Sequence, residues 1–197
     1  CMNLSKSTPS WLAALALLLL AACSSGPTVR TDVDPGADFS GYRSWDFYTP
    51  IAMEANGYTS HTTEQIRAAV AREMEARGYV HDATAPDLKV NFQGLVQDKT
   101  DVYTLPRTDW QYFYSYRANS YVAVPVWYDE TQVSRYREGT LTVDLVDARA
   151  NRLLWTGSAI GRIPAKQSPE KRAVAVDQAV AAVFAQYRHR AQPVSGP

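Results

Sequence analysis

Apolar residues recur at helical spacing in residues 61–77 of the chain. Thr62 and Gln65 match a capping box at the start of this stretch, and Gly78 provides a stop at its end. Its apolar stripe consists of Ile66, Val70 and Met74 together with Ala69. The pattern predicts an amphipathic helix that packs on one side only.

A second helical pattern covers residues 168–187. It begins with a serine cap, a proline and an acid, which is typical of a helix start. The buried stripe is expected to consist of Val176, Val180, Val183, Phe184 and Tyr187. Arg188, His189 and Arg190 follow it and suit the negative end of the helix dipole.

Elsewhere apolar and polar residues alternate with the period of a β-strand. Residues 29–33 and 44–48 are short segments of this kind. Residues 87–96 alternate for longer, and we expect this strand to continue towards Tyr103 after a break. A polar turn joins the alternating residues 140–146 to residues 153–163, which predicts a hairpin.

The order of these elements predicts an α+β fold, with a mixed, mainly antiparallel β-sheet and two helices on one face. We expect a single domain over residues 29–190, with an aromatic-rich insertion at 107–138 and a flexible tail at 191–197. The length of 197 residues leaves little room for a second domain.

The first 22 residues have the pattern of a secretion signal. A polar stretch with the single cation Lys6 precedes an apolar run over residues 11–20. Even counted to Ala22 this run is shorter than the roughly 20 residues that a membrane-spanning helix needs. The sequence that follows, Leu20-Ala21-Ala22-Cys23, resembles the bacterial lipobox, in which the cysteine is acylated and the bond before it is cut.

The lipobox resemblance implies a protein anchored to a membrane through Cys23, with residues 23–28 as a tether. Several acyl chains hold a protein on a bilayer far more firmly than one does. In Gram-negative bacteria Ser24 after the cysteine is associated with the outer membrane, so we expect a lipoprotein facing the periplasm. The alternative is a secreted protein with a coincidental cysteine. Acylation of Cys23 would also leave the mature chain without a disulfide.

Charge and motifs narrow the function classes. Lysines and arginines equal aspartates and glutamates at 20 each, so the chain has no basic excess for nucleic acid. The three histidines, His61, His81 and His189, do not stand at metal-ligand spacing. No nucleophile elbow is present, and we expect no catalytic residue, metal or cofactor. Two pairs of carboxylates could in principle act as general acid and base, as in glycosidases, although we expect structural roles for them. They are Asp144 with Asp147 and Asp98 with Asp101.

The segment 107–138 contains nine of the 22 aromatic residues. Every second residue from Trp110 to Tyr116 is aromatic, which places these rings on one face of an extended chain. The candidate binding surface consists of Trp110, Tyr112, Tyr114, Tyr116, Trp127 and Tyr128. Our expectation favours packing of these rings in a second small core, and the alternative is an interface with protein, glycan or lipid headgroups.

Several motifs together resemble one bacterial lipoprotein family, the domain of unknown function 4136. They are residues 38–45 (DFSGYRSW), 85–90 (APDLKV), 138–141 (EGTL), 143–147 (VDLVD) and 154–157 (LWTG). The resemblance covers about residues 29–187 and implies a lipid-anchored α+β domain without an established activity.

Three hypotheses follow. The first is a non-enzymatic envelope lipoprotein that binds an envelope protein or glycan through the aromatic segment. The second is an envelope hydrolase or transferase that acts on glycan or peptidoglycan through its carboxylates. The third is a purely structural lipoprotein.

Overall fold

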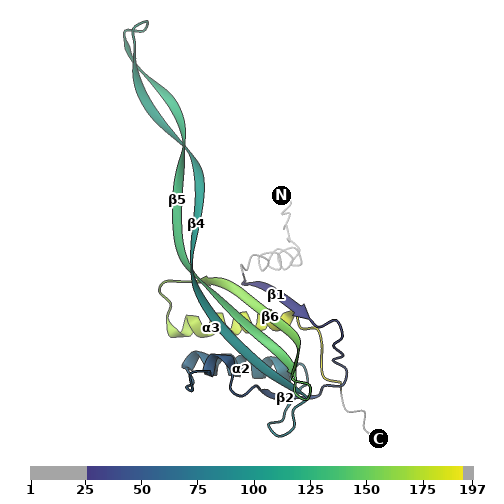
Figure 1. The fold of residues 1–197 in the computed structure, drawn as a ribbon. Coiled ribbons are helices and arrows are strands. Elements are labelled where there is room, and N and C mark those ends of the chain that lie inside the picture. Colours follow the sequence, from purple (N-terminus) through teal and green to yellow (C-terminus); the bar gives the residue numbers. More distant parts are fainter. Residues whose placement is uncertain (1–25, 193–197) are drawn as a thin grey trace, which may run out of the picture.

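The computed structural model describes residues 26–192 and confirms the predicted α+β class. Two helices lie on one face of a mixed sheet, and a long two-stranded ribbon leaves the sheet at one end (Figure 1). The predicted signal, Cys23 and residues 193–197 of the predicted tail lie outside the described residues. Within residues 26–192 no helix is both long and apolar enough to cross a membrane.

The sheet has six strands in the order β1-β6-β5-β4-β2-β3. They are β1 (Thr28–Val33), β2 (Ser44–Phe47), β3 (Val80–His81), β4 (Leu88–Ser115), β5 (Ser120–Asp147) and β6 (Arg152–Ile163). Strand β2 pairs in parallel with β3 and β4, whereas the other neighbours are antiparallel. The predicted hairpin of residues 140–146 and 153–163 is confirmed as the pairing of β5 with β6.

The helices are α2 (His61–Ala76) and α3 (Pro169–Ala185), with a short 3-10 turn η2 (Ala52–Glu54) before α2. Ser168 caps α3 as predicted, because its side chain accepts a hydrogen bond from the Lys171 backbone N–H. The expected capping box of α2 is wrong. The helix begins at His61, so Ser60 is the cap and Thr62 already lies inside the helix. The Ser60 side chain accepts a hydrogen bond from the Thr63 backbone N–H.

The core lies between the two helices and the facing side of the sheet. Its largest fully buried side chains include Trp45, Tyr79, Phe92, Phe184, Met74 and Leu145. Tyr187 follows the end of α3 yet is buried, and its hydroxyl is 2.8 Å from that of Tyr79. Burial raises the pKa of both phenols, which makes them harder to ionise than an exposed tyrosine.

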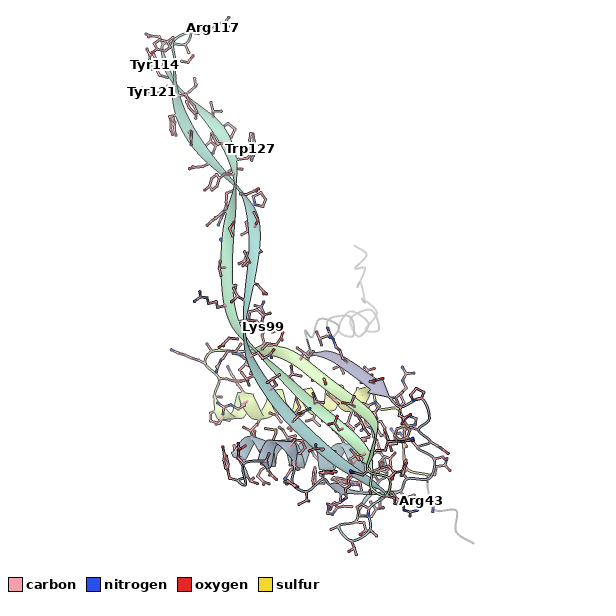
Figure 2. The ribbon with its side chains drawn as sticks, viewed as in Figure 1. Arg43, Lys99, Tyr114, Arg117, Tyr121 and Trp127 are labelled. Atoms are coloured by element: carbon pink, nitrogen blue, oxygen red, sulfur yellow. The ribbon has the colours of Figure 1, made fainter. Side chains whose placement is uncertain are left out.

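Strand β4 runs without the break expected before Tyr103. Strand β5 pairs with β4 residue by residue from Leu88↔Asp147 to Ser115↔Ser120. A single neighbouring strand therefore supplies the backbone hydrogen-bond partners of β4 along its whole length. Strand β6 ends its pairing with β5 at Arg137↔Ile163. Beyond this point β4 and β5 pair only with each other, and residues 99–136 form an arm that projects from the sheet (Figure 2).

Candidate functional site

The arm ends in a four-residue turn. Tyr116, Arg117, Ala118 and Asn119 connect β4 to β5, and Asn119 has a positive φ of 49°. Asparagine tolerates this left-handed conformation better than most residues, which suits it to a tight turn. Figure 2 shows Lys99 at the base of the arm and Arg117 at its far end.

The far part of the arm, residues 110–128, is called the tip, and residues 99–109 and 129–136 are called the shaft. Cross-strand partners share a face of a ribbon. The pairs Trp110↔Pro125, Tyr112↔Ala123, Tyr114↔Tyr121 and Thr108↔Trp127 therefore place five rings on one face. The pairs Phe113↔Val122, Gln111↔Val124 and Arg107↔Tyr128 occupy the other face. Both faces of the tip are thus largely apolar.

The structure corrects the expectation that these rings pack in a second core. Tyr112, Tyr116 and Trp127 are 70%, 90% and 72% exposed. The helices cover only the domain end of the sheet, and no other element of residues 26–192 reaches the tip (Figure 1). The packing interpretation is wrong because the strands continue past the layer that would have covered them.

Not all the candidate residues lie together. Trp110, Tyr112 and Tyr114 share a face with Trp127, whereas Tyr128 lies on the opposite face, paired with Arg107. Tyr116 belongs to the turn, and its ring contacts Tyr114 edge to face at 5.1 Å between centroids.

Two exposed rings of the tip, Phe113 and Tyr121, were missing from the candidate surface. Tyr121 lies opposite Tyr114, with 5.3 Å between the ring centroids. A hairpin turn placed at residues 116–119 in the sequence would have predicted this pair. Phe113 is found only once both faces of the ribbon are considered.

Charge divides the arm into two parts. The tip contains a single charged residue, Arg117, at the turn. The charged residues of the shaft are Lys99, Asp101, Arg107, Asp109, Asp129, Glu130 and Arg135. Arg107 pairs across the strands with Glu130 at 2.6 Å. The shaft is therefore suited to water, whereas the tip exposes uncharged aromatic surface.

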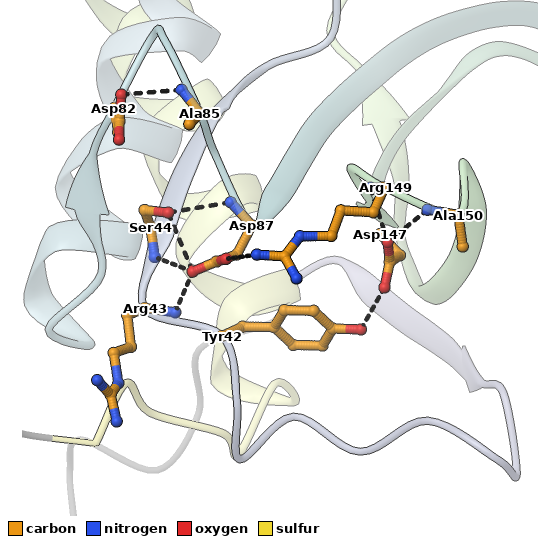
Figure 3. Close-up of polar contacts among 9 residues, drawn as sticks. All are labelled: Tyr42, Arg43, Ser44, Asp82, Ala85, Asp87, Asp147, Arg149 and Ala150. Carbon is orange, nitrogen blue, oxygen red and sulfur yellow. Dashed lines mark hydrogen bonds and ion pairs between the residues drawn. The ribbon is translucent and has the colours of Figure 1, made fainter.

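A second polar cluster lies at the opposite end of the sheet (Figure 3). The Asp87 carboxylate accepts hydrogen bonds from the backbone N–H groups of Arg43 and Ser44, at 3.0 and 3.1 Å, and from the Ser44 hydroxyl. Ser44 Oγ in turn accepts from the Asp87 backbone N–H at 3.0 Å. This reciprocal contact joins the starts of β2 and β4 and fixes their parallel register.

The Asp147 carboxylate closes the turn between β5 and β6. It accepts from the backbone N–H groups of Ala150 and Arg149, and the Tyr42 hydroxyl donates to it at 2.6 Å. The Ala150 bond, followed by the Tyr42 bond, lowers the pKa of Asp147. Burial, with the neighbouring carboxylate, raises the pKa of Tyr42 to about 12.

Three of the four carboxylates singled out in the sequence, Asp101, Asp144 and Asp147, have separate partners in the structure. Asp144 accepts from Thr156 Oγ1 at 2.6 Å across β5 and β6, whereas Asp147 belongs to the turn. Asp101 pairs with Arg162 at 2.6 Å at the base of the arm. Each of these three contacts holds one element of the fold to another.

The Asp87 contacts make stability depend on pH. Burial alone would raise the pKa of Asp87, but the backbone hydrogen bonds from Arg43 and Ser44 outweigh it and lower the pKa below 3.8. A lowered folded-state pKa contributes stability above the unfolded-state value of about 3.9, and this contribution is lost as pH falls through the folded-state pKa. Asp87→Asn should therefore lower the free energy of unfolding by about 1–3 kcal/mol at pH 7.

Urea unfolding of the two proteins across pH 2–7 measures this effect. The difference between wild type and Asp87→Asn should shrink as the pH falls below about 4. A difference of the same size at every pH would contradict the assigned role of the charge.

The histidines do not gather into a site. His61 bonds to Gln65, His81 lies 3.0 Å from Asp46, and His189 stacks on Phe39 with 4.1 Å between ring centroids. Burial lowers the pKa of His189. Among residues 26–192 no group of three or more histidine, cysteine or acidic side chains is placed to hold a metal ion.

An open hollow of about 1310 Å³ lies where the arm leaves the domain, between the sheet and the N-terminal ends of α2 and α3. Its lining includes Gly94, Gly139 and Gly161. Gly26, the first described residue, also lines it. The start of the described chain therefore lies near the base of the arm.

The fold and its motifs define an α+β domain of a known family. Residues 29–187 match the family described as Domain of unknown function (DUF4136), and the chain belongs to this family. This confirms the resemblance seen in the sequence. No curated protein matched the chain.

Two solved structures are similar to this chain at low identity. A PDZ domain protein from Parabacteroides distasonis is similar with a TM-score of 0.55 and 16% identity, over 98% of this chain and 43% of that one. This chain thus spans less than half of that protein. The PelC dodecamer from Paraburkholderia phytofirmans has a TM-score of 0.40 and 14% identity, over 83% of this chain and 98% of that one.

Proposed function

We propose that this protein is a non-enzymatic lipoprotein of the bacterial envelope, anchored through Cys23, that binds another envelope component through the tip of its arm. The observation that carries the proposal is the exposed aromatic tip, whose only charged residue is Arg117 at the turn, at the end of a charged shaft. Exposed contiguous apolar surface on a soluble domain usually marks an interaction site.

The shape of the arm supports binding over a role in folding. Its rings contact neither helix and lie beyond the end of β6, so they add nothing to the buried core. Tyrosine and tryptophan combine a large apolar surface with a polar tip, which suits them to interfaces that exclude water only in part. A ribbon held away from the domain extends the reach of an anchored protein.

The proposed location follows from the lipobox. Acylation of Cys23 would attach the protein to a membrane, and Ser24 favours the outer membrane with the domain in the periplasm. Asp101, Asp144 and Asp147 have separate hydrogen-bond partners that hold parts of the fold together, which favours the binding role over the hydrolase alternative.

One experiment in a Gram-negative host tests both parts of the proposal. The cells are fed a labelled fatty acid, and a photo-crosslinking amino acid replaces the exposed Phe113 in the tip. We expect the protein to incorporate the label and to form an adduct with a protein, glycan or lipid of the envelope. Cys23→Ser should abolish the labelling, because it removes the thiol that would be acylated.

The crosslinker placed at Thr104 of the shaft serves as the control and should give far less adduct. Labelling that persists in Cys23→Ser would overturn the anchor. An equal yield of adduct from Phe113 and Thr104 would overturn the binding role of the tip.

A further inference from the structure

The described chain begins at the end of the domain from which the arm projects. In the sheet register Thr28 of β1 pairs with Ile160 of β6, Ile160 pairs with Thr140, and Thr140 pairs with Leu95. Thr28 is thus level with a point only a few residues before the arm begins at Lys99. Strand β1 runs away from the arm, so its first residue, Thr28, is the one nearest the arm (Figure 1).

The arm is far longer than the tether. Three peptide units separate Gly26 from Cys23, so their Cα atoms are at most about 11 Å apart. The arm strand of residues 99–115 spans roughly 56 Å at the usual rise of a β-strand. An anchor at Cys23 would hold the base of the arm close to the bilayer. Because the arm is longer than the hydrocarbon core is thick, about 30 Å, it can place its tip in the interface only by lying at a shallow angle to the membrane surface.

Contacts at the base hold the arm to the domain. Arg162 of β6 pairs with Asp101 of the shaft at 2.6 Å, and its guanidinium lies over the Tyr136 ring at 3.8 Å from the centroid. Lys99 and Glu138 form a second ion pair across the strands at 3.7 Å. With β4 and β5 continuous from the core into the arm, these contacts set its direction.

The tip is apolar on both faces. One face presents Trp110, Tyr112 and Tyr114, and the other presents Phe113 and a row of valines from β5. A ribbon that docks on a flat protein surface needs only one apolar face. Two apolar faces without charge suit surroundings that contact the tip from all sides, as the interface of a bilayer does.

We infer that the tip lies in the interfacial layer of the lipid bilayer to which Cys23 is anchored, so that the protein contacts the membrane at two points. This inference rests on the proposed function and specifies the component that the tip binds. The outer edges of both arm strands are unpaired within residues 99–136, and their N–H and C=O groups need water or headgroups as partners. The interface supplies these partners, and the hydrocarbon core does not.

The tryptophans provide a direct test. Trp110 and Trp127 are 59% and 72% exposed on the tip, whereas Trp45 and Trp155 are 1% and 4% exposed in the core. The lipidated protein, which loses Trp11 with the signal when the bond before Cys23 is cut, is purified from membranes and reconstituted in phosphatidylcholine vesicles with brominated acyl chains. We expect the vesicles to quench most of the fluorescence of Trp110 and Trp127, and bromine near the headgroup should quench more than bromine near the chain end.

The matched control is the same protein with Trp110→Gln and Trp127→Gln, which retains only the buried Trp45 and Trp155 and should show little quenching. Equal emission of the parent protein in brominated and ordinary vesicles would overturn the inference. If Phe113 then still formed adducts with a protein or glycan in cells, the binding role of the tip would survive with a different partner. Fatty-acid labelling that persists in Cys23→Ser would instead overturn the anchor. The failure of the anchor and the failure of the membrane contact are therefore distinguishable.

Discussion

Changing Trp110, Tyr112, Tyr114 and Tyr116 together to serine should abolish the adducts formed by a photo-crosslinker at Phe113. Truncating an aromatic anchor of a binding surface typically lowers the binding free energy by about 2 kcal/mol or more. Because these rings lie outside the core, the free energy of unfolding of the domain should change by less than about 1 kcal/mol. Crosslinking in cells and urea unfolding of the purified protein measure the two effects.

A matched control changes the same face of the same strand nearer the domain. Thr100, Val102 and Thr104 lie on the shaft at alternate positions of β4, and their replacement by serine should leave the adducts unchanged. If the tip variant instead unfolded the domain, the rings would have a structural role. If both variants retained the adducts, the tip would not be the binding surface.

Gly157→Ala should destabilise the domain by about 3 kcal/mol, the upper end of the cost of overpacking a core. A Cβ atom at Gly157 would lie 2.5 Å from Cη2 of Trp155 and 2.7 Å from Cγ1 of Val183. The Trp155 ring crosses this glycine and packs against Tyr187, with 5.1 Å between ring centroids. The ring is buried and α3 lies directly above, so neither neighbour can move freely. Thermal and urea unfolding measure the loss.

Two further variants isolate the cause. Gly161→Ala lies on the same strand, where the nearest contact of a new Cβ is 3.8 Å from Pro27, and it should have little effect. Trp155→Phe removes Cη2 and Cζ2, so Gly157→Ala should cost much less in that background. Equal costs of Gly157→Ala in both backgrounds would contradict the clash with the tryptophan ring.

Local patterns predicted much of the fold. The alternation in residues 140–146 and 153–163 predicted the β5–β6 hairpin, because one face of each strand is buried under the helices. Ser168 with Pro169 marked the start of α3, since a cap acts on its own first turn. The cap of α2 was misplaced because Ser60 and Thr62 are both chemically able to fill the role.

The candidate site was predicted in part. The alternating rings from Trp110 to Tyr114 were correctly assigned to one face of a strand, because alternation follows from strand geometry alone. Their environment was wrongly expected to be a core. A sequence shows which face a ring occupies, but whether another layer covers that face depends on where β6 and the helices end.

By itself the sequence determined the family, the fold class and the chemical character of each segment, since these depend on local patterns and motifs. Only the tertiary structure decided that the aromatic segment is an exposed arm, that Tyr121 joins Tyr114 on it, and that β1 begins at its base. These features depend on strand length and register across the sheet, which join residues far apart in the chain.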